Sequence, residues 1–192
     1  MLPGVVRAWA LPAVTGVGVG ALTAAFAPGA VFKLAFAVIA AFIALKLLFG
    51  REEWRLGGEL PGGLLNRFYG FLVGLCASLM GISGGSISNL VLTLYGKPLR
   101  NSVATSAGLG VPITIAGTLG YMAAGWQYQS LMPPFSLGFV SAIGVLLMAP
   151  VSSLTAVYGV RLAHWLPRRG LEIGFGLFLL TASARFLAGL LV

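Results

Sequence analysis

Acidic residues are the scarcest component of this chain. It has no Asp, four Glu, one His and one Cys among 192 residues. A single Cys76 excludes an internal disulfide or a cysteine-rich metal centre. With His164 the only imidazole, no triad, carboxylate pair or metal set can be assembled. We therefore expect neither an enzyme nor a protein that binds a metal or another cofactor.

Charge of either sign is absent from residues 101–160. A soluble domain of this size could not bury so long a run, whereas a bilayer accepts it as two or more crossings of ~20 residues each. The chain is 58% hydrophobic and 8% charged, with a mean hydropathy of +0.99. This composition predicts an all-α polytopic membrane protein, with the lipid bilayer as its first partner.

The placement of the few charges limits the class of solute that the protein could carry. A cation or proton pathway usually shows a carboxylate inside a span, but the four Glu lie in or beside connecting segments. A neutral or anionic solute is therefore favoured. The net charge of +8 is scattered between apolar segments, which suits orientation in a membrane and not nucleic-acid binding.

Six apolar segments are separated by breaks rich in Pro, Gly and charge. They fall at 5–26, 30–49, 66–96, 100–124, 131–160 and 169–191. The first could instead be a signal peptide, since Arg7 precedes it and residues 25–27 have the small-x-small form of a cleavage site. Four Trp fall near the predicted span ends, as in an aromatic belt: Trp9, Trp54, Trp126 and Trp165.

The third segment contains a glycine-serine break at Gly81–Ser86. Residues 67–80 predict one helix of ~21 Å and residues 86–95 another of ~15 Å. Irregular backbone at membrane depth survives only where protein buries it or where it lines a cavity. The two half-helices could continue across the membrane or turn back as a re-entrant hairpin.

Basic residues favour the hairpin. If the segment crosses, six of the counted basic residues lie on one side of the membrane and four on the other. If it turns back, Lys33 alone lies opposite all the others, as the positive-inside rule expects. Those others are Arg7, Arg51, Arg55, Arg67, Lys97, Arg100, Arg161, Arg168 and Arg169. We expect five full crossings plus the hairpin, with the N-terminus in the cytoplasm of a bacterial cell and the protein in its inner membrane.

Residues 20–50 and 159–189 align without a gap at an offset of 139, matching Pro28 with Pro167 and Lys46 with Arg185. The hairpin topology gives the two copies opposite orientation, a frequent plan for secondary transporters. Residues 1–50 then form the second half of repeat one, 51–65 a cytoplasmic loop, and 66–192 a complete repeat two. About 60–70 residues of a parent architecture would be missing ahead of Met1. A homo-oligomer or a partner supplying that half-repeat is therefore possible.

The break and the residues that follow it resemble the TauE/SafE sulfite-exporter family. Gly81-Ile82-Ser83-Gly84-Gly85-Ser86, then Lys97-Pro98, then Ser102-Val103-Ala104-Thr105-Ser106 are similar to that family's glycine motif, polar turn and following helix start. The resemblance spans roughly 66–191, with a weaker echo over 10–50. Ser83 and Asn89 depart from the family pattern, where a glycine and a proline are usual.

The resemblance implies export or import of small sulfur-containing or organic anions such as sulfite or sulfonates. The residues suit that chemistry, because the N-terminal end of a half-helix presents unpaired N–H groups and a partial positive charge. The candidate substrate-binding residues are Gly81, Ser83, Gly84, Gly85, Ser86, Ser88, Asn89, Thr105 and Ser106. Each has a structural alternative, namely close packing for Gly and Ser, a bond to a helix carbonyl for Thr105 and Ser106, and a bond between helices for Asn89.

The expected function is secondary transport of such an anion by alternating access around the break. Two other functions stay open: an anion channel, and a non-transporting membrane subunit or fragment that needs a partner. Lys46 and Arg185 would snorkel to the interface or gate the anion.

Overall fold

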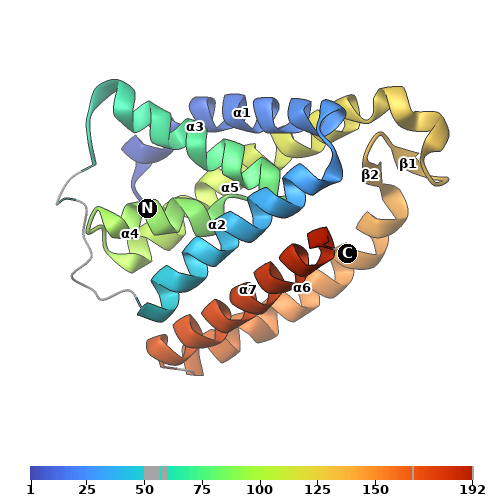
Figure 1. Ribbon diagram of the computed structural model, residues 1–192. Coiled ribbons are helices and arrows are strands. Elements are labelled where there is room, and N and C mark those ends of the chain that lie inside the picture. The colour runs from blue at the N-terminus through green and yellow to red at the C-terminus, as the bar shows by residue number, and fades with distance from the viewer. Residues whose placement is uncertain (50–56, 58–59, 166, 192) are drawn as a thin grey trace.

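The computed structural model describes residues 1–49, 57, 60–165 and 167–191. The helices are α1 (Pro3–Phe26), α2 (Gly29–Phe49), α3 (Gly63–Met80), α4 (Gly85–Leu94), α5 (Leu99–Ala124), α6 (Ala142–Trp165) and α7 (Arg168–Leu191) (Figure 1). Six of these helices, all except α4, are long and apolar enough to cross a membrane. The predicted all-α polytopic fold is confirmed. Most of the predicted loop 51–65, with Trp54 in it, lies outside the described residues.

The first arm of the hairpin is longer than predicted. Helix α3 begins at Gly63, where φ is +66°, and not at Arg67. Its 18 residues rise ~27 Å at 1.5 Å per residue. That length approaches the ~30 Å of a bilayer's hydrocarbon core. The prediction of five crossings therefore did not count α3, which is long enough to cross a membrane by itself.

The segment predicted over 131–160 begins too early. Residues Trp126–Leu131 form a 3-10 helix, and Ser136–Leu137 (β1) pairs antiparallel with Val140–Ser141 (β2) before α6 starts. The apolar composition concealed this connection. Pro133 and Pro134 lack the N–H groups that a helix needs, and Phe135 and Gly138 adopt positive φ.

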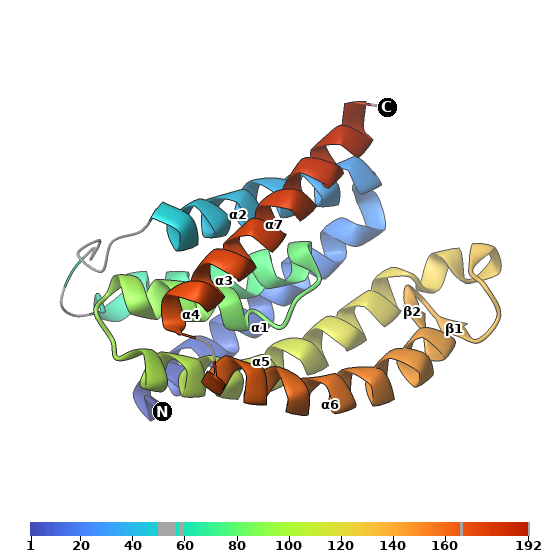
Figure 2. The ribbon, with the colours of Figure 1, turned by 90° about the horizontal axis from the view of Figure 1, so that it is seen from below.

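Helices α1 and α5 run parallel. At one end the backbone N–H of Leu2 donates to Thr105 Oγ1 at 2.8 Å, and at the other the hydroxyl of Tyr128 donates to the carbonyl oxygen of Ala25 at 3.0 Å. A single crossing over 66–96 would have made these helices antiparallel. The chain therefore turns back between α3 and α4, as the hairpin prediction required (Figures 1 and 2).

Helices α2 and α7 pack antiparallel, which the same turn-back requires. Arg169 donates to the carbonyl oxygens of Leu47 at 3.1 Å and Leu48 at 2.6 Å, at the C-terminal end of α2. At the other end the rings of Phe36 and Phe186 lie 4.7 Å apart. Arg169, expected only to set topology, also caps α2. Which side of a membrane each end faces stays a prediction.

Small residues bring α1 and α3 into backbone contact. A Cβ at Gly74 would overlap the carbonyl oxygen of Ala13, and one at Gly20 would lie 2.6 Å from Ser78 Cβ. Such close approach is typical of membrane helix pairs. Trp9 is fully buried in this interface and donates to Asn66 Oδ1 at 2.6 Å. Its placement in an aromatic belt was wrong, because Gly70 of α3 lets the backbone and Cβ of Trp9 pack closely on α3 and bury the side chain.

The bounds of the last two helices, and the buried positions of α7, follow the predicted repeat. Adding 139 to the bounds of α1 gives those of α6, and the first residue of α2 maps onto that of α7. Buried residues on α2 include Ala37, Ala40 and Ala44, and those on α7 include Gly176, Leu179 and Ser183. These three pairs share the offset of 139. The register supports the predicted repeat, although the domain division itself remains a prediction.

Candidate functional site

The break between α3 and α4 is built on two left-handed glycines. Gly81, with φ +67°, ends α3, and its N–H donates to Ser78 O at 3.0 Å. The next N–H, of Ile82, donates to Ala77 O at 2.9 Å. This is the Schellman pattern of helix termination, which favours Gly because it has no Cβ to strain. The predicted break is confirmed, but it is shorter than Gly81–Ser86, because α4 already begins at Gly85.

Helix α4 starts with its backbone donors open. Gly84 precedes it with φ +71°, and no side chain caps this end. The first helical bond runs from Ser88 N to Gly84 O at 2.9 Å. The N–H groups of the three residues before Ser88 consequently have no acceptor within the helix, and they carry its partial positive charge. Ser83 and Ser86 are exposed beside them.

The three glycines at the break are required for different structural reasons. Gly84 is buried, and a Cβ there would lie 3.0 Å from Ile113 Cδ1 and 3.2 Å from Ala77 Cβ. Gly81 has open space around it, and so only its φ requires glycine. At Gly85 a Cβ would meet only Ser83 Oγ, at 3.7 Å. Gly85 therefore leaves room for a solute to approach the backbone.

Two predicted hydroxyls already have partners. Ser88, fully buried, donates to Gly84 O at 2.8 Å, which leaves only its lone pairs for a solute. Thr105, also fully buried, donates to Asn101 O at 2.7 Å and accepts the N–H of Leu2. The helix-bonding alternative therefore describes Thr105, and Ser88 makes a bond of the same kind. Thr105 fixes the start of α1 and has no proton left to donate.

Two other predicted residues have buried polar atoms without partners. Asn89 Oδ1 on α4 and Ser106 Oγ on α5 make no hydrogen bond in the described part of the chain. A Cβ at Gly110 would lie 3.8 Å from Ser83, and Gly84 packs on Ile113. This antiparallel register places Asn89 and Ser106 at one level. An unpaired buried polar group costs about 1–3 kcal/mol, and a bound solute would remove that cost.

Tyrosines missed by the sequence analysis hold the hairpin. Tyr121 on α5 donates to Ser78 O at 2.6 Å, directly before the break. Tyr69, in the N-terminal half of α3, and Tyr95, at the C-terminal end of α4, are joined away from the break by a 2.7 Å bond between their hydroxyls. Tyrosine within an apolar helix was the available signal, because a buried hydroxyl needs a partner.

A family model described as "Sulfite exporter TauE/SafE" matches residues 2–186. The chain belongs to the TauE/SafE sulfite exporter family. The match reaches further towards the N-terminus than the resemblance over 66–191, so α1 and α2 belong to the family pattern as well.

A relative of this TauE/SafE protein, from Haemophilus influenzae, is named "Probable membrane transporter protein". It is 28% identical over 148 residues, which are 77% of this chain and 56% of the relative. The chain thus spans just over half the length of that relative. No solved structure matches the chain.

Lys46 of this TauE/SafE chain lies far from the open end of α4. Its Nζ donates to Thr93 Oγ1 at 3.2 Å, and Thr93 is in the last turn of α4. The bond joins α2 to the hairpin at the end opposite the break. Lys46 is therefore half-buried against protein, and neither a simple snorkelling role nor contact with the open N–H groups describes it.

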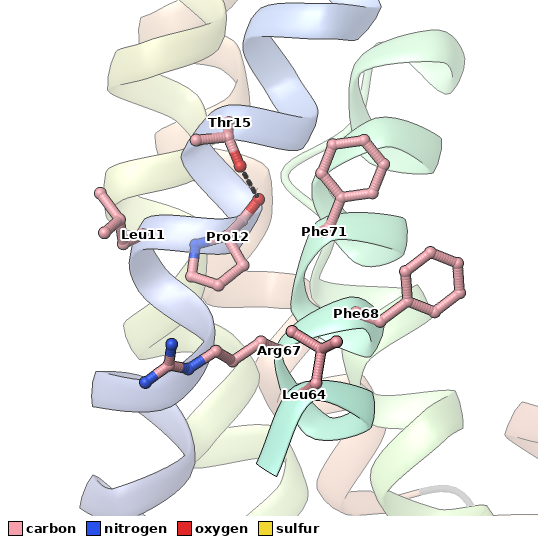
Figure 3. Close-up of a pocket in the computed structure, with 7 residues that line it drawn as sticks. All are labelled: Leu11, Pro12, Thr15, Leu64, Arg67, Phe68 and Phe71. Carbon is pink, nitrogen blue, oxygen red and sulfur yellow. Dashed lines mark hydrogen bonds between the residues drawn. The ribbon is translucent and has the colours of Figure 1, made fainter.

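An apolar groove of about 400 Å³ lies between α1 and α3, away from the break (Figure 3). Its lining is Leu11, Pro12, Thr15, Leu64, Arg67, Phe68 and Phe71. Thr15 donates its hydroxyl proton to Pro12 O at 2.7 Å, and Arg67 is the one charged residue in the lining. The groove suits acyl chains better than a small anion.

Proposed function

We propose that this chain takes part in secondary transport of small sulfur-containing or organic anions, of sulfite or sulfonate type, across the bacterial inner membrane. The observation that carries the proposal is the uncapped N-terminal end of α4, held open between Gly81 and Gly84. An oxyanion there would accept hydrogen bonds from backbone N–H groups and interact favourably with the helix dipole.

The polar residues around this end suit an anion. Ser86 lies exposed in the first turn of α4, and Ser106 has a buried hydroxyl with no partner among the described residues. Turning the Asn89 amide by 180° exchanges its acceptor for an N–H donor without moving the backbone. A sulfite or sulfonate presents three oxygens, which these donors could share with the helix amides.

Alternating access would carry the anion past the break, with the N-terminus in the cytoplasm. The tyrosine bonds join each arm of the hairpin to α5 or to the other arm. The hairpin would therefore move together with α5, and motion against the α2–α7 pair would break the bond between Lys46 and Thr93. A static filter at the same residues would instead make an anion channel.

Flux measurements separate these possibilities. Radiolabelled sulfite, sulfate and a sulfonate are offered to proteoliposomes that contain the purified chain. Saturable uptake accelerated by unlabelled anion inside the vesicles is the expected result, whereas single-channel currents would establish the channel. Gly85→Leu should abolish uptake, because Gly85 has space for the side chain but the leucine would cover the open N–H groups.

Gly18→Leu is the matched control, since Gly18 lies in α1 and a Cβ added there would meet nothing within 4 Å. Normal uptake by Gly85→Leu would overturn the site. Flux that appears only when a second membrane protein is added would establish the chain as a partner-dependent subunit. The exposed state of α6 favours this last possibility over the channel.

A further inference from the structure

Helix α6 has the register of α1 but lacks its cover. The two helices share bounds at the offset of 139, yet α1 is packed on α3 and α5. In α6, by contrast, every residue whose burial is described is exposed except Gly144, which is half-buried. None of the residues of its apolar window, Ala142–Gly159, is buried. Helix α6 lies at the edge of the bundle in both views (Figures 1 and 2).

The uncovered helix repeats the contact face of α1. Buried positions of α1 include Ala13, Gly16, Val17 and Gly20. Their equivalents, here called the α6 small-residue face, are Ser152, Thr155, Ala156 and Gly159. Small residues are what close backbone packing between membrane helices requires. Thr155 already donates to Val151 O at 2.8 Å, so its hydroxyl could be buried at little cost.

We infer that the α6 small-residue face docks a partner of the α3–α5 type, namely a glycine-broken helical hairpin followed by a spanning helix. On α1 the equivalent face is covered by α3 and α5 of this chain. The internal repeat therefore identifies what covers such a face. The inference concerns an interface and does not depend on which solute is carried.

A second copy of this chain does not supply the missing cover. In the part of the chain that the structure describes, each copy has two helices with this face, α1 and α6, but one unit of the α3–α5 type, and α1 of the same copy occupies it. Covering α6 therefore requires an additional unit of this type. Helices α1 and α2 are antiparallel, as are α2 and α7, and α7 and α6, so α6 runs opposite to α1. The docked unit is therefore inverted relative to α3–α5.

The register predicts which residues meet. A Cβ at Gly117 of α5 would lie 3.6 Å from Val17 Cγ1 of α1. In the docked unit, the residue equivalent to Gly117 should lie against Ala156, the counterpart of Val17. Tyr158 corresponds to Val19, which is 44% exposed on α1. Tyr158 should therefore remain in contact with lipid.

The test supplies a unit of known sequence. Residues 57–141 are joined ahead of Pro3 of the full chain. The added unit then precedes α1 as the original unit precedes α6, which preserves the offset of 139 and gives the added unit the inverted orientation. In a background with Cys76→Ala in both copies, Ala156→Cys is combined with Gly117→Cys in the added unit and oxidised with copper phenanthroline. A disulfide is expected for this pair and not for Tyr158→Cys with the same Gly117→Cys. Val17→Cys with Gly117→Cys in the original unit is the positive control.

A second measurement covers the case in which geometry blocks the disulfide. Labelling of Ala156→Cys by a lipid-soluble maleimide should fall about tenfold when the unit is added, while labelling of Tyr158→Cys should not change. Equal labelling at both positions, or crosslinking from Tyr158→Cys alone, would overturn the inference. So would an Ala156→Cys dimer of the unextended chain. None of these readouts involves flux, and so their failure is distinct from failure of the proposed transport.

Discussion

The hydroxyl of Tyr121 donates a 2.6 Å hydrogen bond to the carbonyl oxygen of Ser78. That carbonyl also accepts the N–H of Gly81 at 3.0 Å. A side chain of α5 thus holds the last turn of α3 at the point where the helix is interrupted. The break is a braced structure and not a loose loop.

Tyr121→Phe should loosen the break. Removing the hydroxyl leaves Ser78 O with one donor fewer, and hydrogen bonds between membrane helices contribute about 0.6 kcal/mol on average. We expect a lower thermal midpoint in detergent and faster hydrogen exchange at residues 81–87. Tyr158→Phe is the control, because Tyr158 is 67% exposed. Equal effects of the two substitutions would show that the bond to Ser78 does not matter.

Asparagine should distinguish the two glycines of the break. Asn tolerates the left-handed conformation better than other residues with a Cβ, and Gly81 has open space around it. Gly81→Asn should therefore be nearly neutral, whereas Gly81→Val should cost about 1–2 kcal/mol. At Gly84 even Asn should destabilise strongly, since Ile113 and Ala77 occupy the space. Thermal unfolding in detergent tests this order, and a neutral Gly84→Asn would contradict it.

Gly74→Ala should separate α1 from α3. The added methyl would overlap Ala13 O, and forcing atoms into a packed interface costs about 1–3 kcal/mol. A lower midpoint of unfolding and easier proteolysis between α2 and α3 are expected. Gly18→Ala, on the open side of α1, should instead be neutral or slightly stabilising, because alanine favours helix. Similar midpoints for the two variants would argue against close packing at Gly74.

Ser106→Ala separates a binding role from a structural one. Its buried hydroxyl has no partner in the described residues, so removing it should not lower stability in the absence of solute, and could raise it by up to about 1 kcal/mol. Anion uptake should nevertheless fall several-fold. The thermal shift produced by sulfite in the parent protein should shrink in parallel. A variant that unfolds earlier yet transports normally would reverse this assignment.

Cysteine labelling tests the predicted membrane topology. In a Cys76→Ala background, Gly62→Cys and Lys97→Cys should react with an impermeant maleimide from one side, and Lys33→Cys from the other. Parallel α1 and α5 require this arrangement. Reaction of Gly62→Cys and Lys97→Cys from opposite sides would refute the hairpin topology. Cytoplasmic reaction of the first pair would also establish the orientation proposed from the basic residues.

Much of the fold was predictable from hydropathy and helix punctuation. Pro98 before α5 and the glycines at 81 and 84 mark helix ends through backbone constraints that act locally. The connection after α5 was missed, since residues 131–141 are apolar and hydropathy does not separate an apolar loop from a span. Only the adjacent prolines indicated the break there.

The candidate site was predictable only in part. The sequence placed the break correctly, but it could not distinguish Ser106, whose hydroxyl is without a partner in the described part of the chain, from Thr105, whose hydroxyl is used. The partner of Thr105 is Leu2, 103 residues away along the chain. Such pairings depend on tertiary packing, as does the burial of Trp9. No local pattern reveals them.

The length of α3 sets how far a solute must travel. The depth of the break, however, is set by how α4 returns along α3. A Cβ at Gly84 would lie 3.2 Å from Ala77 and 3.4 Å from Val73, and Gly74, next to Val73, packs on Ala13 in the middle of α1. The first amides of α4 therefore lie near mid-span and not at the end of α3. If this end binds the proposed anion, the paths to the two compartments are of similar length, and distance alone favours neither direction of transport.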